Sequence, residues 1–566
     1  MKIFLFCKQY LSAQKYRVAV FVILTLLSSA IGIISPYIVG KFLDNLVAGA
    51  DKQVIFRFCI IYGGFNILKI IKDYINSIMF TKMQVQMSYD LNMRAIKHVQ
   101  SMSLSFINRK DGLYLNQRIN IDSLNLITFC LTTLQGIVTN FILIIVPFVI
   151  LLVSNRLITV LMVGFMFVYI ALYLGLRGWL YRVGLIFKES QAKLQAKLYE
   201  QLRHIKLIKV NSVQPEMNSR AEESFADFRV KAIRSQRANF IYSSLDGIIS
   251  TLAQITLFVV GGLQVAKGNF TVGMFTVFFS YFSMIIKSTR YFYGLGSAYQ
   301  NALSSYDRIK SIFKYPSESR GSKMIEDVDC IELQDVSFDY NAVLPDADEP
   351  ADAEPTEGTE SKEAKVIDSF SAKFEKGNLY AIAGPNGTGK STLIGLLIGL
   401  YIDEYTGAIK YNDVSIRELD MVSVRKKLIG FAEQEPLLVN ASVWYNLAYN
   451  DHIGSGESDS ASIPHALIEY IDTLNMKSFI DQNGLSFIVN DKNTNLSGGE
   501  KQKIAILKVL YKNPAVMIFD EPTSALDKDT TGKFIDYLQR IKDDKIIIIV
   551  THDEYVQRRC DAIIQM

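Results

Sequence analysis

The residues best suited to chemistry form a glycine-rich loop that ends in a lysine and a serine. The loop has the spacing G-x-x-x-x-G-K-S from Gly384 to Ser391, after the apolar run 379–383 and before the apolar run 392–400. Strand, loop and helix in this order turn backbone N–H groups inward at a helix N-terminus, where they bind phosphate oxygens. Lys390 adds a positive charge, and the Ser391 hydroxyl can bind Mg²⁺. A glycine-rich turn without a ligand is the alternative, and the flanking runs argue against it. The predicted triphosphate site consists of Gly384, Pro385, Asn386, Gly387, Thr388, Gly389, Lys390, Ser391 and Thr392.

Two further apolar runs end in side chains that suit triphosphate hydrolysis. Asp520 and Glu521 end and follow the run 516–519, and His552 follows the run 546–550. Buried parallel strands present such residues together at their carboxyl edge. We expect Asp520 to bind Mg²⁺, Glu521 to polarise the attacking water and His552 to hydrogen-bond the γ-phosphate. Glu521 and His552 are therefore the predicted catalytic residues.

A second phosphate-binding helix start is predicted at Ser497, Gly498 and Gly499. The first N–H groups of a helix attract anions. One nucleotide needs only one glycine-rich loop, so this second site suggests a nucleotide held by a partner chain.

Composition excludes several functional classes. The 566 residues suit two or three domains, with 49% hydrophobic residues, 20% charged residues and a net charge of +4. No basic stripe with interleaved aromatic residues occurs, which argues against nucleic-acid binding. The five cysteines are scattered and form no Cys-x-x-Cys pair, so neither a disulfide framework nor a zinc site is indicated.

Six apolar runs in the first half are long enough to cross a bilayer. Buried helices of a soluble protein are the alternative, but such helices rarely reach this length or cluster so densely. The expected spans cover residues 18–39, 54–80, 126–153, 157–176, 240–265 and 272–293.

Charge in the connections predicts the orientation of these spans. Lysine and arginine gather before the first span and in the long connections after the second and fourth spans, whereas the other connections are short. This distribution places both termini and the C-terminal domain in the cytoplasm. The helix-forming composition of residues 190–200 and 216–237 predicts helical extensions beyond the membrane. Composition also suits a bacterial plasma membrane.

Ionisable residues inside the spans are candidates for a polar cargo cavity, because charges in a membrane usually face a cavity or a partner. The candidates are Lys69, Asp73, Asp246, Lys287 and Arg290. Two alternatives remain open: the helices have already left the membrane at this depth, or Lys69 and Asp73 pair with each other.

A Pro-, Ser- and Gly-containing linker near residues 315–321 divides the chain. The expected fold is an α-helical membrane domain at 1–315 followed by an α/β P-loop ATPase domain at 316–566. Residues 341–365 are acidic and poor in apolar side chains, so a disordered insertion is expected, with an interaction segment as the alternative.

The ordered motifs of the second half resemble the nucleotide-binding domain of ATP-binding cassette (ABC) proteins. The motifs are Tyr340, Gly384–Thr392, Gln434, Leu496–Glu500, Asp520–Glu521, Ser524–Asp527 and His552. Six spans before one such domain resemble an exporter-type half-transporter. Arg118–Asp122 resembles the family's first intracellular loop, and Ser305–Ile309 resembles its connector, so the resemblance covers essentially the whole chain.

The resemblance implies a dimer that binds two ATP molecules, and we expect the dimer to consist of two copies of this chain. Each ATP would lie between one chain's glycine loop and the other chain's Ser497–Glu500 segment, with Asp527 also at the ATP site. Tyr340 would stack on adenine, and Gln434 and Asp520 would serve Mg²⁺. Glu500 stands where the family usually has Gln, and an added carboxylate near phosphate is expected to weaken binding modestly.

The expected function is ATP-driven export of an amphipathic cargo, either a peptide, such as a modified antimicrobial peptide, or a lipid-like molecule. Efflux of small drugs is the alternative within the same class. An ATP-gated channel or sensor, and an importer with an exporter-like fold, are the alternatives of other classes.

Overall fold

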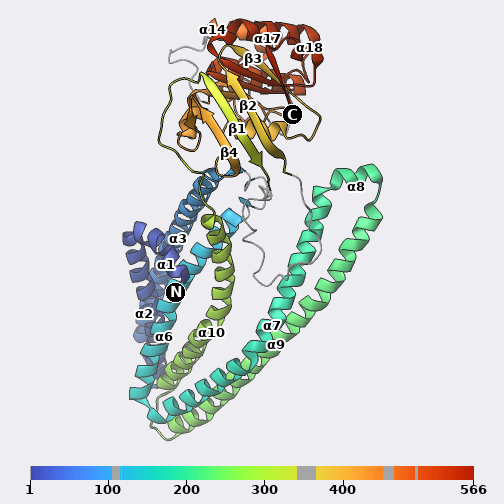
Figure 1. Cartoon of the computed structure of the whole chain (residues 1–566). Coiled ribbons are helices and arrows are strands. Elements are labelled where there is room, and N and C mark those ends of the chain that lie inside the picture. The colour runs from blue at the N-terminus through green and yellow to red at the C-terminus, as the bar shows by residue number, and fades with distance from the viewer. Residues whose placement is uncertain are drawn as a thin grey trace. The chain divides into compact units, whose positions relative to one another are not determined.

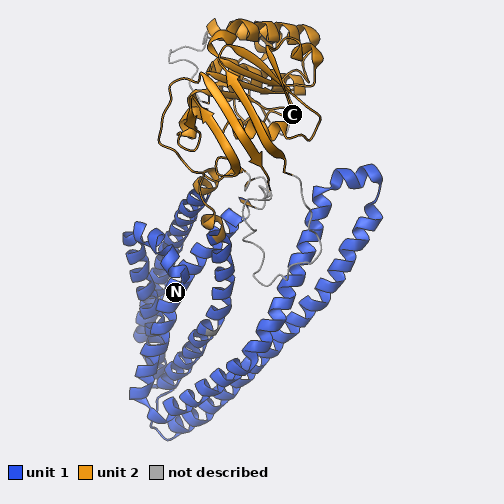
Figure 2. Cartoon of the chain, in the orientation of Figure 1, with its two compact units in different colours: residues 1–95, 116–310 blue, residues 96–115, 311–566 orange. Residues whose placement is uncertain are grey.

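The computed structural model describes residues 2–104, 107, 115–116, 118–340, 365–449, 465–490 and 495–566. The chain forms two compact units (Figure 2). The membrane unit contains residues 1–95 and 116–310, and the cassette unit contains residues 96–115 and 311–566. Most of the predicted acidic insertion, residues 341–364, lies outside the described residues.

The membrane unit is built from helices (Figure 1). They are α1 (Lys2–Ala13), α2 (Lys15–Val47), α3 (Lys52–Gln100), α6 (Ser123–Ser154), α7 (Arg156–Arg203), α8 (Ile205–Asn211), α9 (Gln214–Ala266) and α10 (Val272–Lys314). Among the described residues, α2, α3, α6, α7, α9 and α10 are long and apolar enough to cross a membrane. The predicted class, a helical domain with six spans, is confirmed.

The long helices extend well beyond the length that a bilayer requires. Helices α3, α7 and α9 contain 49, 48 and 53 residues, whereas about 20 residues span the hydrocarbon core. Helices α7 and α9 run side by side, joined through α8 (Figure 1). Many apolar side chains on these helices point outward, including Phe56, Ile60 and Phe167, as expected for surfaces that contact lipid rather than water.

Two glycines allow close contacts between α10 and its neighbours, one with the backbone of α2 and one with a tyrosine side chain of α10. A Cβ at Gly273 would lie 1.9 Å from the carbonyl oxygen of Gly40 on α2. A Cβ at Gly136 on α6 would lie 2.2 Å from the hydroxyl oxygen of Tyr291. Only glycine leaves room for these contacts. The Asp44 carboxylate, which accepts from the Gly273 N–H at 2.6 Å, also ties α2 to the start of α10.

The cassette unit contains two sheets flanked by short helices. The antiparallel sheet has the order β2-β1-β4-β5, and the parallel sheet has the order β6-β7-β8-β3-β9. The strands are β1 (Cys330–Phe338), β2 (Ile367–Glu375), β3 (Asn378–Ala383), β4 (Tyr405–Tyr411), β5 (Val414–Ser415), β6 (Ile429–Ala432), β7 (Val516–Asp520), β8 (Ile546–Val550) and β9 (Ala562–Gln565). The helices are α11 (Lys390–Leu397), α12 (Met421–Lys427), α13 (Val443–Ala448), α14 (His465–Thr473), α15 (Lys477–Asn483), α16 (Gly498–Lys512), α17 (Lys528–Ile541) and α18 (Glu554–Gln557).

The parallel sheet separates two hydrophobic cores and brings the chemical residues to one edge. Successive residues of β8 alternate between the cores: Ile546 and Ile548 pack in one, and Ile547 and Ile549 in the other. Strand β8 pairs in parallel with both β7 and β3. The carboxyl ends of these three strands therefore carry the glycine loop, Asp520 and the segment with His552.

Residues 96–115, which connect the second span to the third, belong to the cassette unit and not to the membrane unit. The Glu318 N–H donates to the carbonyl of Ser101 at 2.7 Å. The Ser103 hydroxyl donates to Glu404, and Leu104 packs against the core of this unit. Residues after α3 thus form part of the cassette surface, and α3 leads from them directly into the membrane unit.

Candidate nucleotide site

The glycine loop joins β3 to α11 in a conformation that needs glycine. Gly387 and Gly389 have φ angles of +87° and +94°, a region that L-residues rarely adopt. The Lys390 ammonium donates to the carbonyls of Gly384 at 2.7 Å and Pro385 at 3.0 Å. The side chain therefore lies across its own loop and is positioned to exchange these carbonyls for phosphate oxygens.

Ser391 and Asp520 form the oxygen pair that suits a magnesium ion. The Ser391 hydroxyl donates to Asp520 Oδ2 at 3.3 Å. Burial raises the pKa of the Asp520 carboxyl above its ordinary value, the hydrogen bond from Ser391 opposes the rise, and the charge of Glu521 adds to it. A nearby cation would offset that cost of burial. In the described ranges, no group of three His, Cys, Asp or Glu residues could hold a metal ion.

Glu521 lies between Gln434 and His552. Its Oε2 accepts from Gln434 Nε2 at 2.8 Å, and its Oε1 is 3.4 Å from His552 Nε2. The backbone of Glu521 has φ +44°, which is unusual for a residue with a Cβ and is typical of functional sites. The Glu521 N–H donates to the Val550 carbonyl at 2.9 Å, so β8 supports this conformation.

His552 connects the carboxylate to the glycine loop. Its Nε2 is 3.0 Å from Lys390 Nζ as well as 3.4 Å from Glu521 Oε1. The tautomer with its proton on Nδ1 accepts from Lys390, and a proton on Nε2 would be donated to Glu521. The imidazole can therefore serve as acceptor or donor at the position where the terminal phosphate would bind.

Tyr340 lies next to the first turn of α11. Its hydroxyl is 3.0 Å from Thr392 Oγ1, and its ring makes edge contacts with Phe338 and Tyr401. The aromatic ring is therefore at the glycine loop, where a base attached to bound phosphates could reach it.

The second helix start is capped by its own residues. Ser497 and Glu500 form a reciprocal capping box at the start of α16. The Ser497 N–H and hydroxyl both donate to Glu500 Oε2, at 2.7 and 2.8 Å. Ser497 and Gly498 are exposed, and a Cβ at Gly499 would lie 2.9 Å from the Ala525 carbonyl oxygen. The exposed start leaves N–H groups accessible to an anion from outside this chain.

Asp527 caps the neighbouring helix α17. Its Oδ1 accepts from the Thr530 N–H at 2.9 Å, and its Oδ2 accepts from the Thr530 hydroxyl at 2.7 Å. These hydrogen bonds lower the pKa of the Asp527 carboxyl. The side chain thus has a structural role in this chain, in addition to any contact across a dimer.

Comparison with known proteins identifies the family. The sequence model of the ABC transporter transmembrane region matches residues 18–289, and that of the ABC transporter family matches residues 367–524. The chain belongs to the ABC transporters. It is a multi-pass membrane protein and an ATPase whose hydrolysis is coupled to transport. Its domain order is that of an exporter half-transporter, as the sequence predicts.

Curated relatives of this transporter come from several organisms, and two of their names refer to what is transported. ABC transporter B family member 1 of Dictyostelium discoideum is 28% identical over 417 residues, which are 71% of this chain and 42% of that longer protein. Lactococcin-G-processing and transport ATP-binding protein LagD of Lactococcus lactis is 25% identical over 94% of this chain and 72% of its own length. Putative multidrug export ATP-binding/permease protein YgaD of Bacillus subtilis is 24% identical over 99% of this chain and 93% of its own length.

A solved structure supports the fold of the whole transporter. A bacterial Atm1-family ABC exporter with ATP bound has a TM-score of 0.78 and 18% identity, covering 98% of this chain and 94% of that one. At this identity the likeness shows the fold alone. Both units of the transporter therefore follow the architecture of an ABC exporter.

The predicted cavity residues of the transporter do not form one cluster. Lys69 and Lys287 are exposed. Asp73 pairs with its neighbour Lys72 at 2.8 Å, rather than making the alternative pair with Lys69. Lys72, which the five candidates omit, is buried and donates to Ser28 on α2. The rotation of α3 about its own axis decides which of Lys69, Lys72 and Asp73 points into the membrane unit. Hydropathy averaged over a window of residues gives no information about this rotation.

The remaining two candidates form an ion pair between spans. Arg290 Nη2 on α10 is 2.5 Å from Asp246 Oδ2 on α9, and Arg290 Nε donates to Asp246 Oδ1 at 3.1 Å. Asp246 is buried. Tyr169 on α7, which the sequence did not single out, interacts with Asp246 through its hydroxyl. This cluster inside the membrane unit is a second site of interest.

Proposed function

We propose that two copies of this chain form a homodimer that exports an amphipathic cargo from the cytoplasm by alternating access, driven by ATP. The proposal is carried by one observation: Lys390, Glu521 and His552 lie within contact of one another at the carboxyl edge of the parallel sheet. The helix start at Ser497 is exposed, so a second chain could reach it. One chain would hold the phosphates, and its partner would close the site.

The described side chains suit distinct roles in hydrolysis. Tyr340 stacks on adenine, and Lys390 leaves its loop carbonyls to bind the outer phosphates. Glu521, oriented by Gln434, polarises the attacking water, and His552 hydrogen-bonds the γ-phosphate.

Magnesium would be held by Ser391, Gln434 and Asp520. A magnesium ion held there would offset the negative charge of the phosphates. In the same closed state, the Ser497 N–H region of the second chain faces the phosphate, and Asp527 lies at the junction of the two chains.

The movement of the cassette unit on dimer closure would be transmitted to the membrane spans through the covalent connection between the two units. Residues 96–115 are part of the cassette unit, and α3 continues from Gln100 into the membrane unit. ATP favours the closed dimer because it contacts both chains only there, and this differential contact shifts the conformational equilibrium. We place both termini and the cassette in the cytoplasm of a bacterial cell, on the basis of the basic connections.

An amphipathic cargo is favoured by the polar cluster at Asp246 and Arg290, because ionisable groups inside spans usually serve a pathway or a partner. One relative's name refers to processing and transport of lactococcin G, and another's refers to multidrug export. A small drug is therefore the alternative cargo class.

The test is ATP-dependent cargo movement in inside-out membrane vesicles, with wild type and Glu521→Gln compared on peptide, phospholipid-analogue and dye cargoes. We expect wild-type vesicles to accumulate a peptide or lipid analogue and Glu521→Gln vesicles to accumulate none. Accumulation of dyes alone would favour drug efflux. Movement out of these vesicles would indicate an importer, and ATP-dependent ion currents without cargo movement would indicate a channel.

A further inference from the structure

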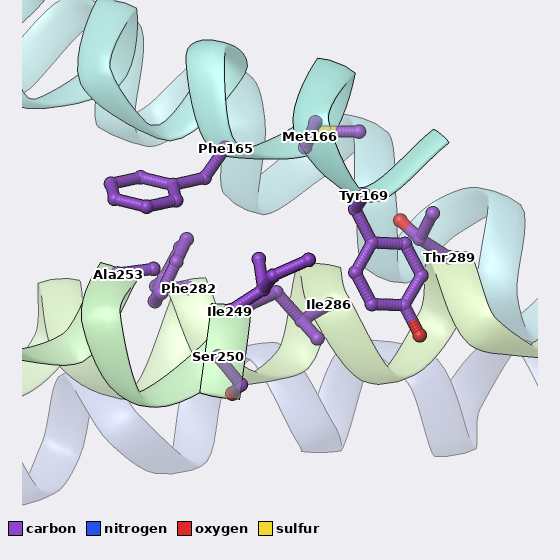
Figure 3. A pocket seen from close by; sticks show the side chains of 9 residues that line it. All are labelled: Phe165, Met166, Tyr169, Ile249, Ser250, Ala253, Phe282, Ile286 and Thr289. Carbon is purple, nitrogen blue, oxygen red and sulfur yellow. The ribbon is translucent and has the colours of Figure 1, made fainter. Parts of the chain in front are cut away.

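Helices α7, α9 and α10 of the membrane unit enclose a small apolar pocket (Figure 3). Phe165 and Phe282 lie at one end of it, and Tyr169 and Thr289 lie at the other. The free space has room for about one water molecule, which is too little for a cargo. A residue with a more specific role lies in the cassette unit, next to the proposed adenine contact.

Tyr401 is packed against Tyr340. The two rings are perpendicular, with centroids 5.9 Å apart. Phe338 contacts both rings, with its centroid 4.8 Å from that of Tyr340 and 4.9 Å from that of Tyr401. Tyr401 is 5% exposed and Phe338 is 1% exposed, whereas Tyr340 is only half-buried. Edge contacts of this kind favour a definite orientation of the rings, so Tyr340 is a partly exposed ring on a buried aromatic support.

This support is also in contact with the helix that follows the glycine loop. A Cβ at Gly395 on α11 would lie 2.5 Å from Cε2 of Tyr401, so the helix backbone lies against the ring. The Tyr340 hydroxyl is 3.0 Å from Thr392 Oγ1 on the same helix and 3.5 Å from the Tyr401 hydroxyl. Burial raises the pKa of Tyr401, so its hydroxyl stays protonated. Tyr401 therefore holds the ring of Tyr340 and the phosphate-binding helix in one arrangement.

The chain that follows Tyr401 is restrained as well. The Asp403 carboxylate accepts from the Ser319 N–H at 2.9 Å, and Glu404 accepts from the Ser103 hydroxyl. These hydrogen bonds limit the movement of the segment that carries Tyr401. The buried ring is therefore a fixed surface for Tyr340.

We propose that Tyr401 is a positioning residue for the nucleotide base, because it holds the ring of Tyr340 in the orientation that stacks on adenine. Without the Tyr401 ring, Tyr340 is free to turn, and the base contact weakens while the phosphate contacts are unchanged. The Tyr401 hydroxyl is secondary, since 3.5 Å to Tyr340 is long for a hydrogen bond between hydroxyls. This inference rests on the proposed contact between Tyr340 and adenine and names the residue that supports it.

The test compares the binding of ADP and of inorganic pyrophosphate to the full-length protein in lipid nanodiscs. Both ligands carry two phosphates, and only ADP carries a base. Radiolabelled ADP gives one dissociation constant, and its displacement by pyrophosphate gives the other, so the measurement needs no ATP hydrolysis. We expect Tyr401→Leu to bind ADP about tenfold more weakly than wild type, the order of a lost base stack, and to bind pyrophosphate with unchanged affinity.

Further variants separate this role from general packing. Tyr401→Phe keeps the ring and should bind ADP like wild type. Tyr340→Leu should lose as much ADP affinity as Tyr401→Leu, and the double variant should lose no more, because both residues act through one contact. Gly395→Ala presses on the Tyr401 ring without removing it and should also weaken ADP binding alone. The matched control is Tyr405→Leu, at a tyrosine 4% exposed in the same core, which should bind both ligands like wild type.

Hydrolysis gives a second measurement of the same role. Tyr401→Leu should raise the ATP concentration for half-maximal hydrolysis about tenfold and leave the maximal rate unchanged, since only binding of the base is affected. A wild type that binds ADP with the expected variant pattern but does not hydrolyse ATP would contradict the transport proposal and leave the role of Tyr401 intact.

Wild-type ADP affinity in Tyr401→Leu would overturn the inference. Equal losses of ADP and pyrophosphate affinity in both Tyr401→Leu and Gly395→Ala would overturn it too, because they would show general damage to the fold. If Tyr340→Leu alone loses ADP affinity, the positioning role fails and the adenine contact stands. If neither tyrosine affects ADP binding, the proposed adenine contact fails together with the positioning role.

Discussion

Arg308 donates two hydrogen bonds to the buried carboxylate of Asp122, from Nε to Oδ2 at 2.7 Å and from Nη2 to Oδ1 at 2.5 Å. Asp122 immediately precedes α6, and Arg308 lies in the last turns of α10, 186 positions later. The Ser305 hydroxyl also donates to Asp122, at 2.8 Å. The two motifs that resembled the family's intracellular loop and connector are therefore bound to each other.

Removing Arg308 from this pair should destabilise the membrane unit more than removing the charge of Asp122. The Asp122 side chain is 5% exposed and that of Arg308 is 40% exposed, so only the arginine can be rehydrated when its partner is removed. Arg308→Ala should lower stability by about 3 kcal/mol, and Asp122→Asn by about 1 kcal/mol. The measurement is thermal unfolding of the detergent-purified protein.

The double variant Asp122→Asn/Arg308→Ala should be more stable than Arg308→Ala, because no buried carboxylate is left unpaired. The control is Arg558→Ala, which removes a pair with Glu554 whose side chains are 79% and 78% exposed. The exposed Arg558–Glu554 pair should contribute little to the free energy of unfolding. Equal losses for Arg308→Ala and Arg558→Ala would contradict the assignment.

Gly136 should be intolerant of even one added methyl group. A Cβ there would lie 2.2 Å from the Tyr291 hydroxyl oxygen and 2.3 Å from its Cζ. Alanine in a helix normally stabilises by about 1 kcal/mol relative to glycine, but here overpacking should cost about 1–3 kcal/mol. Thermal unfolding of Gly136→Ala tests the sign of the change.

Gly164→Ala is the matched comparison, because a Cβ at Gly164 on α7 would meet nothing within 4 Å. It should be neutral or stabilising, and Tyr291→Leu should restore the stability of Gly136→Ala. Stabilisation by both alanines would show that α6 and α10 do not pack at Gly136.

Glu500→Gln should strengthen ATP binding while keeping the helix cap. The Glu500 carboxylate accepts from Ser497, and a glutamine carbonyl can accept the same hydrogen bonds. The substitution removes a negative charge beside the proposed phosphate site, an effect of about 1 kcal/mol near water. The ATP concentration for half-maximal hydrolysis should fall about fivefold. A lower melting temperature of Glu500→Gln, or a higher ATP concentration for half-maximal hydrolysis, would contradict this prediction. The control is Glu554→Gln, which changes an exposed carboxylate and should alter neither quantity.

The Asp527 cap should give the cassette a pH-dependent stability. The pKa of Asp527 is lowered in the folded chain by hydrogen bonds from Thr530, so its carboxylate stabilises α17 above the ordinary pKa of Asp and loses that contribution as pH falls through the lowered value. At neutral pH, Asp527→Ala should cost about 1 kcal/mol. The difference in melting temperature between wild type and Asp527→Ala should shrink in acid, whereas Asp527→Asn should retain the cap at every pH. A difference that grows in acid would contradict the sign.

Features with a local signal could be predicted from the sequence. The runs 516–519 and 546–550 indicate buried strands because they are continuously apolar, and β7 and β8 are fully buried. Glycines at 387 and 389 predict a tight phosphate loop because few other residues adopt φ angles of +87° and +94°. The six spans follow from hydropathy, which marks the membrane crossing and not the helical extensions of α3, α7 and α9.

Features set by helix rotation or long-range pairing could not be predicted. The Asp246–Arg290 pair joins residues 44 positions apart on different helices, and its formation depends on how α9 and α10 face each other. Lys72 rather than Lys69 is buried because their directions around α3 differ. The left-handed backbone of Glu521 has no sequence signal, and the Glu521 N–H donates to the Val550 carbonyl of the neighbouring strand, a contact between residues 29 positions apart.

The central claim, that this chain alone forms a working ATP-driven transporter, is tested most directly by ATP hydrolysis of the purified protein in lipid nanodiscs. Wild type should hydrolyse ATP without another protein. Glu521→Gln should lose at least about 100-fold of this activity and still bind ATP, and Glu554→Gln should hydrolyse like wild type. An inactive wild type would contradict the homodimer, and full activity of Glu521→Gln would contradict the assigned catalytic site.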